Sequence, residues 1–271
     1  SLVGQSLVNL EIVCINDGST DSSWNILMEY QEKYNEKITI VNTVNRGVWF
    51  ARKTGLEYAR GKYISFCDSD DIVDSRMYED MLDILKKNQS DMVVCGFNRV
   101  DINANKILSE EMTQFGNRTI DVADKKWIYS IINTSLWNKV LKKEIAEQAI
   151  NFKKPPRVME DTMFLASIYP LIKKISFCNN IYYHYIIRPG TAMTYIKEDE
   201  VNLLILDMKE TRKFICNKFG NTYLPMIDLI AFIHLGLSLI TKIIQNDDVK
   251  AKEWVKQIKN VLYHECIFQI N

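Results

Sequence analysis

The sequence predicts an α/β protein with a mostly parallel sheet, helices on both faces of that sheet, and a C-terminal helical region. Three observations support this fold class. Short runs rich in Val and Ile alternate with amphipathic helical patterns through the first hundred residues, and strands joined by helices pair in parallel through right-handed crossovers. Polar and acidic clusters follow two of the predicted strands. From about residue 198 the pattern is helical to the end.

The predicted elements follow in a regular order. We expect strands at residues 10–16, 38–42, 62–67 and 91–97, and helices at 22–34, 47–59 and 75–88. The first helix would turn its apolar side chains inward, namely Trp24, Ile26, Leu27 and Tyr30. Residues 98–195 are mixed, with a strand pair near 174–188, and three helices at about 198–219, 222–245 and 247–267 complete the chain. We therefore expect one domain at 1–195 and a helical region at 196–271.

Composition excludes some classes of partner and leaves others open. The 271 residues contain 34 basic and 34 acidic side chains, and this zero net charge argues against broad binding to nucleic acid or anionic lipid. Six Cys with no C-x-x-C pair predict the reduced thiols of a cytosolic protein. Asp228 and His234 interrupt the apolar stretch at 225–245, which favours a buried helix; a helix on a membrane surface or at a dimer interface is the alternative.

The acidic cluster Asp68-Ser69-Asp70-Asp71 directly follows a predicted strand. In parallel sheets, ligands bind beyond the carboxyl ends of the strands. Carboxylates spaced by one residue suit Mg²⁺ or Mn²⁺, which would offset the charge of a leaving diphosphate. The alternative is a solvated turn in which Asp71 or Asp74 caps the next helix.

Two further acidic positions are candidates for binding or catalysis. Asp17 follows the first strand, where a carboxylate can accept a hydrogen bond from a nucleobase and Gly18 would let a ligand approach the backbone; plain turn chemistry is the alternative. Glu160 and Asp161 begin a helix. The helix dipole favours an ionised carboxylate there, which suits a general base, and an N-terminal cap is the alternative.

Four segments in order carry a family resemblance. They are Val-Cys-Ile-Asn-Asp-Gly-Ser-Thr-Asp from residue 13, Val-Asn-Arg-Gly-Val-Trp-Phe-Ala-Arg from 44, Gly-Lys-Tyr-Ile-Ser-Phe-Cys-Asp-Ser-Asp-Asp from 61, and Met-Glu-Asp-Thr from 159. Together they resemble the family 2 glycosyltransferases with the GT-A fold, over residues 5 to about 195. The resemblance implies a bacterial-type enzyme that transfers a sugar, with inversion, from a nucleotide-diphosphate sugar to a hydroxyl acceptor in polysaccharide or glycolipid biosynthesis.

The resemblance also implies roles for the acidic residues. Asp17 would hold the nucleobase. Asp68 and Asp70 would form the D-x-D pair, which contacts the ribose and the divalent Mn²⁺ or Mg²⁺ on the diphosphate, with Asp70 as the metal ligand. Asp161 would be the single catalytic base that deprotonates the acceptor hydroxyl.

Three other residues match family segments. Trp137 and Lys139 match a W-x-K segment and would bind the acceptor, with Trp137 stacked on a sugar face; a core position for Trp137 is an equal alternative. Arg188, in Arg-Pro-Gly-Thr, would close over the diphosphate, and a surface turn is its alternative.

The sequence departs from the family pattern in three places. Trp49 replaces a small residue and Lys53 replaces an Asn, which puts the donor preference in doubt. Pro189 stiffens the Arg188 loop. The family domain opens with a strand and a helix before the segment found here at residues 1–7, so we expect the sheet to lack its central strand or to fill that gap from a neighbouring chain.

Two other function classes stay open. One is a non-catalytic sugar- or nucleotide-binding or assembly module; the other is a nucleotidyltransferase, which would need a Gly-rich phosphate loop that the sequence does not show. The expected partners of the leading hypothesis are a nucleotide-sugar donor and a saccharide or lipid-linked acceptor. A homodimer, and peripheral contact of a cytoplasmic protein with the inner face of the membrane, are open expectations. The neutral charge predicts weak binding to liposomes at most.

Overall fold

The computed structural model describes residues 1–103, 105–123, 125–151, 159–188, 198–245 and 251–264. The chain divides into two compact units. Unit 1 contains residues 1–121, 135–148 and 172–187, and unit 2 contains 122–134, 149–171 and 188–271. Two segments of unit 2 precede residue 196, so the compact units differ from the two contiguous ranges that the sequence predicts. A domain boundary near 195 stays a prediction.

Unit 1 contains every strand found among the described residues. A two-stranded ladder joins β1 (Ile12–Asp17) to β2 (Ile38–Thr43). The larger sheet has the order β3 (Tyr63–Ile64), β8 (Lys139–Lys142), β5 (Met92–Asp101), β9 (Lys174–Ile187), β4 (Ile72–Val73), with β6 (Lys106–Glu111) on β5 and β7 (Thr119–Asp121) on β9. The two longest ladders, β1–β2 and β5–β9, are parallel and the shorter ones antiparallel. The α/β class is confirmed.

The strands of unit 1 form two separate ladders. Among the described residues, β1 pairs only with β2, and no ladder joins it to β3 or to the rest of the larger sheet. This break matches the gap that we expect in the sheet. It leaves one edge of β1 without a partner strand in the described part of the chain.

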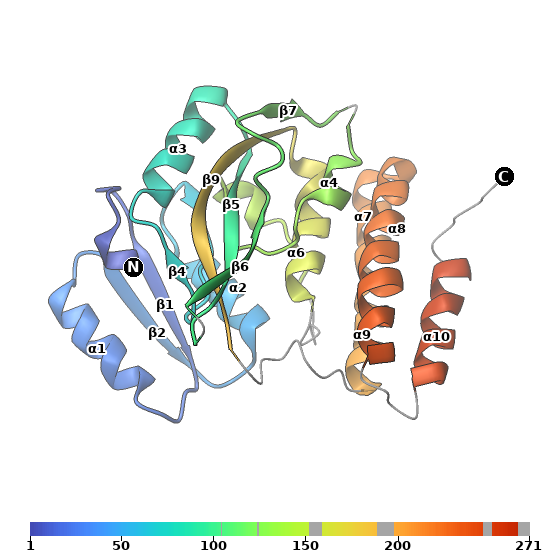
Figure 1. Ribbon diagram of the computed structural model, residues 1–271, viewed down its shortest axis with the longest axis horizontal. Helices are drawn as coiled ribbons and strands as arrows, with labels where there is room; N and C mark the ends of the chain where they lie inside the picture. The colour runs from blue at the N-terminus through green and yellow to red at the C-terminus, as the bar shows by residue number, and fades with distance from the viewer. Residues whose placement is uncertain (104, 124, 152–158, 189–197, 246–250, 265–271) are drawn as a thin grey trace. The chain divides into compact units, whose positions relative to one another are not determined.

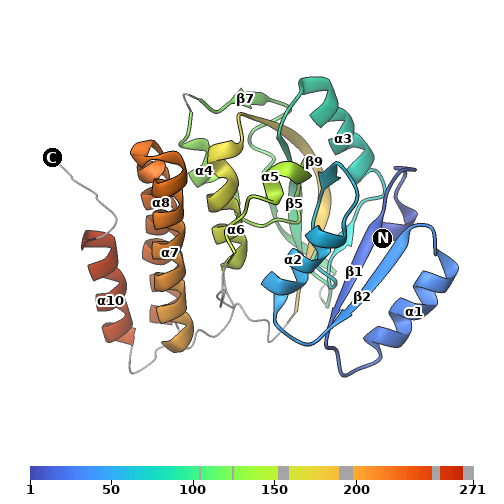
Figure 2. The same ribbon diagram turned by 180° about the vertical axis from the view of Figure 1, so that it is seen from behind.

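The helices of unit 1 pack on its strands as the α/β pattern requires. Helix α1 (Ser23–Lys33) packs on β2, α2 (Val48–Tyr58) on β1, and α3 (Met77–Asn88) on β5 and β9 (Figure 1). Figure 2 shows α2 and the short α5 (Lys143–Ala146) in front of the strands. The predicted inward face of α1 is wrong in part, because Ile26 and Tyr30 are 49% and 48% exposed. A ladder of only two strands offers too narrow a surface to cover that helix.

Two predicted strands differ in extent from those observed. The predicted pair near 174–188 is one continuous strand, β9, whose register against β5 shifts on either side of Gly96. An added Cβ on Gly96 would lie 3.0 Å from the carbonyl oxygen of Asn180, so the irregular strand needs glycine opposite it. The predicted strand at 62–67 pairs only over Tyr63–Ile64, and an irregular segment carries the chain from there to Asp68.

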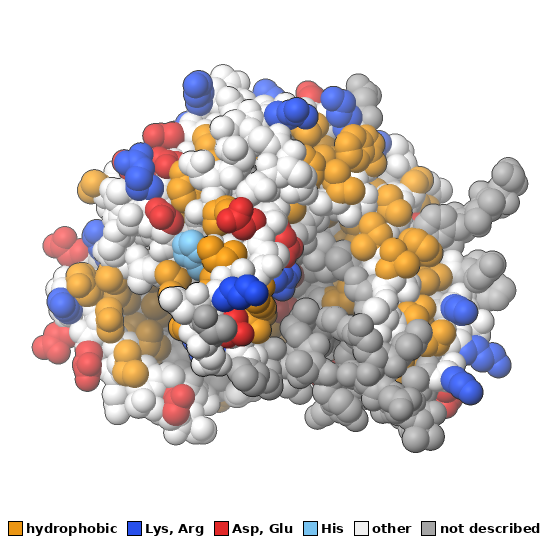
Figure 3. All heavy atoms as spheres, viewed as in Figure 1, with side chains coloured by type: hydrophobic (Ala, Val, Ile, Leu, Met, Phe, Trp, Pro, Cys, Tyr) orange, Lys and Arg blue, Asp and Glu red, His pale blue; other side chains and the backbone are white. Residues whose placement is uncertain are grey.

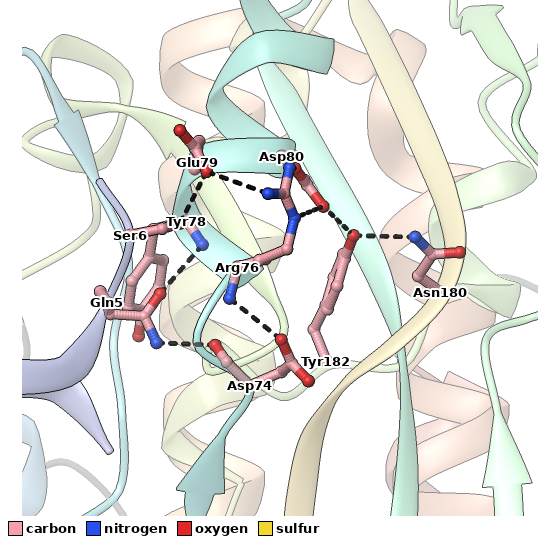
Figure 4. A network of polar contacts seen from close by, with 9 residues as sticks. All are labelled: Gln5, Ser6, Asp74, Arg76, Tyr78, Glu79, Asp80, Asn180 and Tyr182. Atoms are coloured by element: carbon pink, nitrogen blue, oxygen red, sulfur yellow. Dashed lines mark hydrogen bonds and ion pairs between the residues drawn. The ribbon is translucent and has the colours of Figure 1, made fainter. Parts of the chain in front are cut away.

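The first residues of the chain are tied to the start of α3 (Figure 4). They include a 3₁₀ turn, η1 (Leu2–Gly4). The Gln5 amide donates to the carbonyl oxygen of Asp74 at 2.6 Å and accepts from the backbone N–H of Tyr78 at 3.4 Å. The Ser6 hydroxyl donates to the Glu79 carboxylate at 2.7 Å. Gln5 therefore has a structural role, since it satisfies backbone groups around the turn that precedes α3.

Unit 2 is helical. Its elements are α4 (Ile128–Ile131), α6 (Glu160–Ile168), η2 (Tyr169–Leu171), α7 (Glu198–Phe219), η3 (Asn221–Tyr223), α8 (Leu224–Ala231), the π-helical η4 (Phe232–Leu239), α9 (Ile240–Gln245) and α10 (Ala251–His264). Helical structure occupies all three predicted C-terminal ranges over the described residues, with the second divided among η3, α8, η4 and α9. Both views show α7, α8 and α10 side by side (Figures 1 and 2).

The acidic residue within the apolar stretch at 225–245 has a partner. Arg212 on α7 forms an ion pair of 2.9 Å with Asp228 on α8, whose side chain is only 7% exposed. Pairing offsets much of the cost of burying that carboxylate. This contact supports the prediction of a buried helix for α8, whereas Phe232 and Leu237 later in the stretch are exposed. None of the helices over the described residues combines the length and the apolar character needed to cross a bilayer.

Candidate functional site

The carboxylate of Asp17 organises the turn that leads into α2. Its Oδ1 accepts from the backbone N–H of Arg46 at 3.0 Å and from the Thr43 hydroxyl at 3.2 Å, and its Oδ2 accepts from the backbone N–H of Gly47 at 2.7 Å. A carboxylate has about four lone-pair positions, so one remains for a ligand. The nucleobase role of Asp17 stays a prediction, and the structural role of its carboxylate is evident.

Gly18 is required by the chain itself. Its φ of +69° lies in the left-handed region, and an added Cβ would be 2.7 Å from the backbone nitrogen of Asn45. The glycine therefore allows two backbone segments to meet beyond the carboxyl ends of β1 and β2. The sequence suggested instead that Gly18 admits a ligand, and the neighbour observed there is Asn45.

The D-x-D residues occupy a turn between β3 and β4. Arg52, which projects from α2, donates to Asp68 with an Nη2–Oδ1 distance of 3.1 Å. The Arg52 side chain is 10% exposed and that of Asp68 is 33% exposed, whereas Asp70 is exposed. Arg52 lies in the Ala-Arg segment of the family pattern, which is the signal that could have identified it from the sequence.

Two groups of β9 hold the carboxylate of Asp71. The Tyr183 hydroxyl donates to its Oδ2 at 2.6 Å, and the backbone N–H of Ile186 donates to its Oδ1 at 2.8 Å. Burial raises the pKa of Asp71 to about 6, against the opposing effect of those two hydrogen bonds. The capping alternative is therefore wrong for Asp71. Asp74 instead accepts from the backbone N–H of Arg76, in the turn before α3.

Trp137 and Lys139 both lie inside unit 1. Trp137 is 5% exposed and stacks on Tyr183, with centroids 4.2 Å apart and an interplanar angle of 15°. Lys139 is fully buried, and its Nζ donates to the carbonyl oxygen of Ser135 at 2.6 Å and to Oδ1 of Asn138 at 2.8 Å. This burial favours the core alternative for Trp137. Their acceptor-binding role stays a prediction without support from the geometry.

Asp161 lies in the first turn of α6, in unit 2, whereas Asp17, Asp68 and Asp70 belong to unit 1. Asp161 is partly exposed, and the next residue, Thr162, is buried and donates to the hydroxyl of Thr134 at 2.9 Å. That bond fixes the helix start. The positive end of the helix dipole favours a carboxylate at this position.

Arg188 is exposed and directly follows the end of β9. The remainder of its predicted loop, residues 189–191, lies outside the described residues, and so does the basic and proline-containing segment 152–158. The role of Arg188 at a diphosphate stays a prediction.

The acidic donors suit one kind of metal site. Within the described ranges, no group of three or more His, Cys, Asp or Glu side chains is placed to hold a metal ion. Asp70 is an exposed carboxylate, and Asp68 beside it is partly engaged by Arg52. These oxygens fit a hard divalent cation that takes most of its ligands from a diphosphate and from water. They do not fit a cage made of protein ligands alone.

Comparisons with known proteins identify the family and the fold of the chain. The family described as "Glycosyl transferase family 2" matches residues 1–150. A cholesterol galactosyltransferase of Borreliella burgdorferi is 30% identical over 235 residues, which cover 82% of this chain and 65% of that protein. A poly(ribitol-phosphate) beta-glucosyltransferase of Bacillus spizizenii is 32% identical over 198 residues, which cover 72% of this chain and 30% of that protein. The chain thus spans less than two thirds of the length of either relative.

A solved structure shares the fold. The crystal structure of S. aureus TarS 1–349 in complex with UDP-GlcNAc superimposes with a TM-score of 0.77 at 19% identity, over 96% of this chain and 74% of that chain. This likeness confirms the predicted GT-A fold. Because the family match covers more than half of the sequence, the protein belongs to glycosyl transferase family 2.

Proposed function

We propose that this chain contributes the donor site and the catalytic base of an inverting glycosyltransferase, which moves a sugar from a nucleotide-diphosphate sugar to a hydroxyl of a bacterial polysaccharide or glycolipid. The observation that carries the proposal is the turn at Asp68–Asp71, in which Arg52 donates to Asp68 and Tyr183 donates to Asp71. That turn presents Asp70 to solvent beyond a strand end. Family membership and the glycosyltransferase names of the relatives support the same reaction class.

The proposed reaction is a single displacement. Asp161 accepts the proton of the acceptor hydroxyl, whose oxygen forms a bond to the anomeric carbon while the bond from that carbon to the diphosphate breaks. The nucleoside diphosphate leaves with the bonding electrons, and attack from the opposite face inverts the anomeric configuration. Asp17 and Asp68 would orient the nucleoside. Asp70 would hold Mn²⁺ or Mg²⁺, which when bound offsets the charge that develops on the diphosphate.

A panel of nucleotide sugars tests the donor site. One donor is expected to raise the Tm of the protein in the presence of Mn²⁺ and not after chelation, because a ligand that binds only the folded state stabilises it by mass action. UDP-GlcNAc belongs in the panel, since the TarS structure contains it. If no donor shifts the Tm and none is hydrolysed or transferred, the proposal fails.

A non-catalytic binding module is the second candidate, and the break between the β1–β2 ladder and the larger sheet favours it. An incomplete sheet could retain nucleotide affinity while losing the geometry that transfer requires. Calorimetry with the stabilising donor, combined with an assay for released nucleoside diphosphate, separates the two candidates. Binding without turnover supports the module.

We further propose that unit 2 contacts an anionic membrane surface. Apolar side chains gather over α8 and η4, with Lys and Arg side chains over α10 beside them (Figure 3). Phe232 and Leu237 are 38% and 54% exposed, and Trp127, next to the α4 helix that packs on α8, is 54% exposed. Because only 38–54% of each of these side chains is exposed, burying the exposed part in a lipid interface contributes about 1 kcal/mol each, and each nearby Lys adds about 1 kcal/mol with anionic lipid. This surface favours stronger binding than the neutral charge predicts.

Vesicle co-sedimentation tests this contact. The protein is expected to bind vesicles that contain phosphatidylglycerol more strongly than vesicles of phosphatidylcholine alone, and Leu237→Glu is expected to weaken that binding several-fold. Ile107→Glu is the matched control, because Ile107 is 52% exposed on β6 of unit 1. Equal binding by both variants would contradict the proposal. The proposal would also be contradicted if the wild-type protein bound no vesicles and formed a dimer that Leu237→Glu dissociates.

A further inference from the structure

Tyr183 is a buried tyrosine whose hydroxyl reaches the D-x-D turn. Its side chain is 0% exposed, on β9, and its ring stacks on Trp137 with centroids 4.2 Å apart. The ladder between β4 and β9 pairs Val73 directly with Tyr183, so the strand that follows the turn is fixed against the same residue. The stacking on Trp137 therefore fixes the face of the Tyr183 ring, and the pairing with Val73 fixes the Tyr183 backbone.

One hydroxyl contacts both ends of the turn. The Tyr183 oxygen donates to Oδ2 of Asp71 at 2.6 Å and accepts from the backbone N–H of Asp68 at 3.2 Å. Asp71 is anchored a second time, since its Oδ1 accepts from the backbone N–H of Ile186 at 2.8 Å. A backbone bond of 3.3 Å from Asp71 N–H to the carbonyl oxygen of Asp68 closes the turn. Asp70 lies between two points that β9 fixes.

We propose that Tyr183 and Asp71 are positioning residues for the donor site, and that Trp137 acts through Tyr183. The inference rests on the proposed function and deepens it. A buried hydroxyl–carboxylate pair is costly unless both partners are satisfied, and here the pair also satisfies the Asp68 N–H. The arrangement fixes the backbone that carries the Asp68 and Asp70 carboxylates before a nucleotide arrives. Such preorganisation lowers the ordering cost of binding.

Trp137 was predicted to bind the acceptor, and its position beside Tyr183 assigns it to the support of the donor site instead. Trp137 is 5% exposed, so it offers little surface for stacking on an acceptor sugar. It also meets Phe97 edge to face, with centroids 4.7 Å apart. Its indole fixes the plane of the Tyr183 ring and hence the direction of the hydroxyl. Substitutions of Trp137 should therefore raise the KM for the donor and leave the KM for the acceptor unchanged.

Tyr183→Phe tests the inference, with Tyr185→Phe as the matched control. The first variant keeps the ring and its stacking and removes only the hydroxyl. Tyr185 lies on the same strand and also stacks on Trp137, with centroids 5.9 Å apart. A hydrogen bond to a charged group corresponds to about tenfold or more in an equilibrium constant, which sets the upper limit of what this bond can add to donor affinity by ordering the turn. We expect Tyr183→Phe to raise the donor KM, and the Kd for nucleoside diphosphate with Mn²⁺, by about tenfold. The acceptor KM should not change, and Tyr185→Phe should match the wild type.

A pair of Trp137 variants adds an independent test. Trp137→Phe should keep a stacking partner and retain most of the donor affinity, whereas Trp137→Leu should raise the donor KM and leave the acceptor KM unchanged. A rise confined to the acceptor KM would overturn the inference and restore the acceptor-binding role. A lower Tm in Tyr183→Phe with unchanged nucleotide Kd would show a merely structural hydroxyl, and the proposed function would stand. A wild-type protein that binds no nucleotide would overturn both.

Discussion

Asp161→Asn is expected to lower the rate constant of sugar transfer by about 10²- to 10⁴-fold, because a positioned general base contributes that much to catalysis. Asn is nearly the same size and cannot accept the proton of the acceptor hydroxyl. Donor affinity should not change, since Asp161 is proposed to take a proton from the acceptor hydroxyl and has no proposed contact with the nucleotide. Single-turnover transfer, measured together with calorimetry on the same preparation, separates the two effects.

Glu160→Gln is the matched control for this experiment. Glu160 is the other carboxylate in the first turn of α6, so both substitutions remove one charge from the same helix end. We expect Glu160→Gln to retain transfer to within a few-fold. The reverse outcome, with loss of transfer in Glu160→Gln and full activity in Asp161→Asn, would assign the base to Glu160.

Asp70→Asn is expected to abolish the Mn²⁺-dependent part of donor binding. Asp70 is exposed, so the substitution should change the free energy of unfolding by less than about 0.5 kcal/mol. If the Asp70 carboxylate holds the cation, its replacement by the Asn amide removes both the negative charge and the hard oxygen ligand that the cation prefers. Donor affinity with Mn²⁺ should then fall to the value measured in chelator, as titration calorimetry would show.

Asp83→Asn provides the comparison for Asp70→Asn. Asp83 is an exposed carboxylate on α3, outside the turn, and its loss changes the net charge by the same amount. It should leave the Mn²⁺ effect intact. If Asp70→Asn retained Mn²⁺-dependent donor binding, Asp70 would not be a ligand of the metal.

Local pattern was sufficient to predict much of the fold. The alternation of strands and helices predicted β1, α1, β2, α2 and α3 to within a few residues, and the apolar periodicity of the C-terminal region predicted its three helices. The exposed face of α1 was not predictable, because periodicity shows which side chains share a face and not whether a broad sheet covers it. The same limit explains Trp137, whose sequence context is equally compatible with a sugar platform and a core position.

The polar contacts around the turn depend on tertiary structure. Asp71 and Tyr183 are 112 positions apart, and nothing in their spacing predicts the bond between them. The sequence placed Asp68 and Asp70 at a strand end from local pattern alone. It could not distinguish Asp71 as the anchored member, since all three carboxylates look alike before β9 (Lys174–Ile187) is placed beside them.

The separation of the β1–β2 ladder from the larger sheet has a consequence for local stability. None of the α1 residues is buried, and each strand of the ladder buries only two residues or fewer. A segment with so few buried contacts opens at a lower free energy than the global unfolding of its unit. Its amide hydrogens are therefore expected to exchange with solvent sooner than those of β5 and β9. If Asp17, at the end of β1, holds the nucleobase as predicted, a bound nucleotide would slow that exchange, and part of its binding free energy would be used to close the segment.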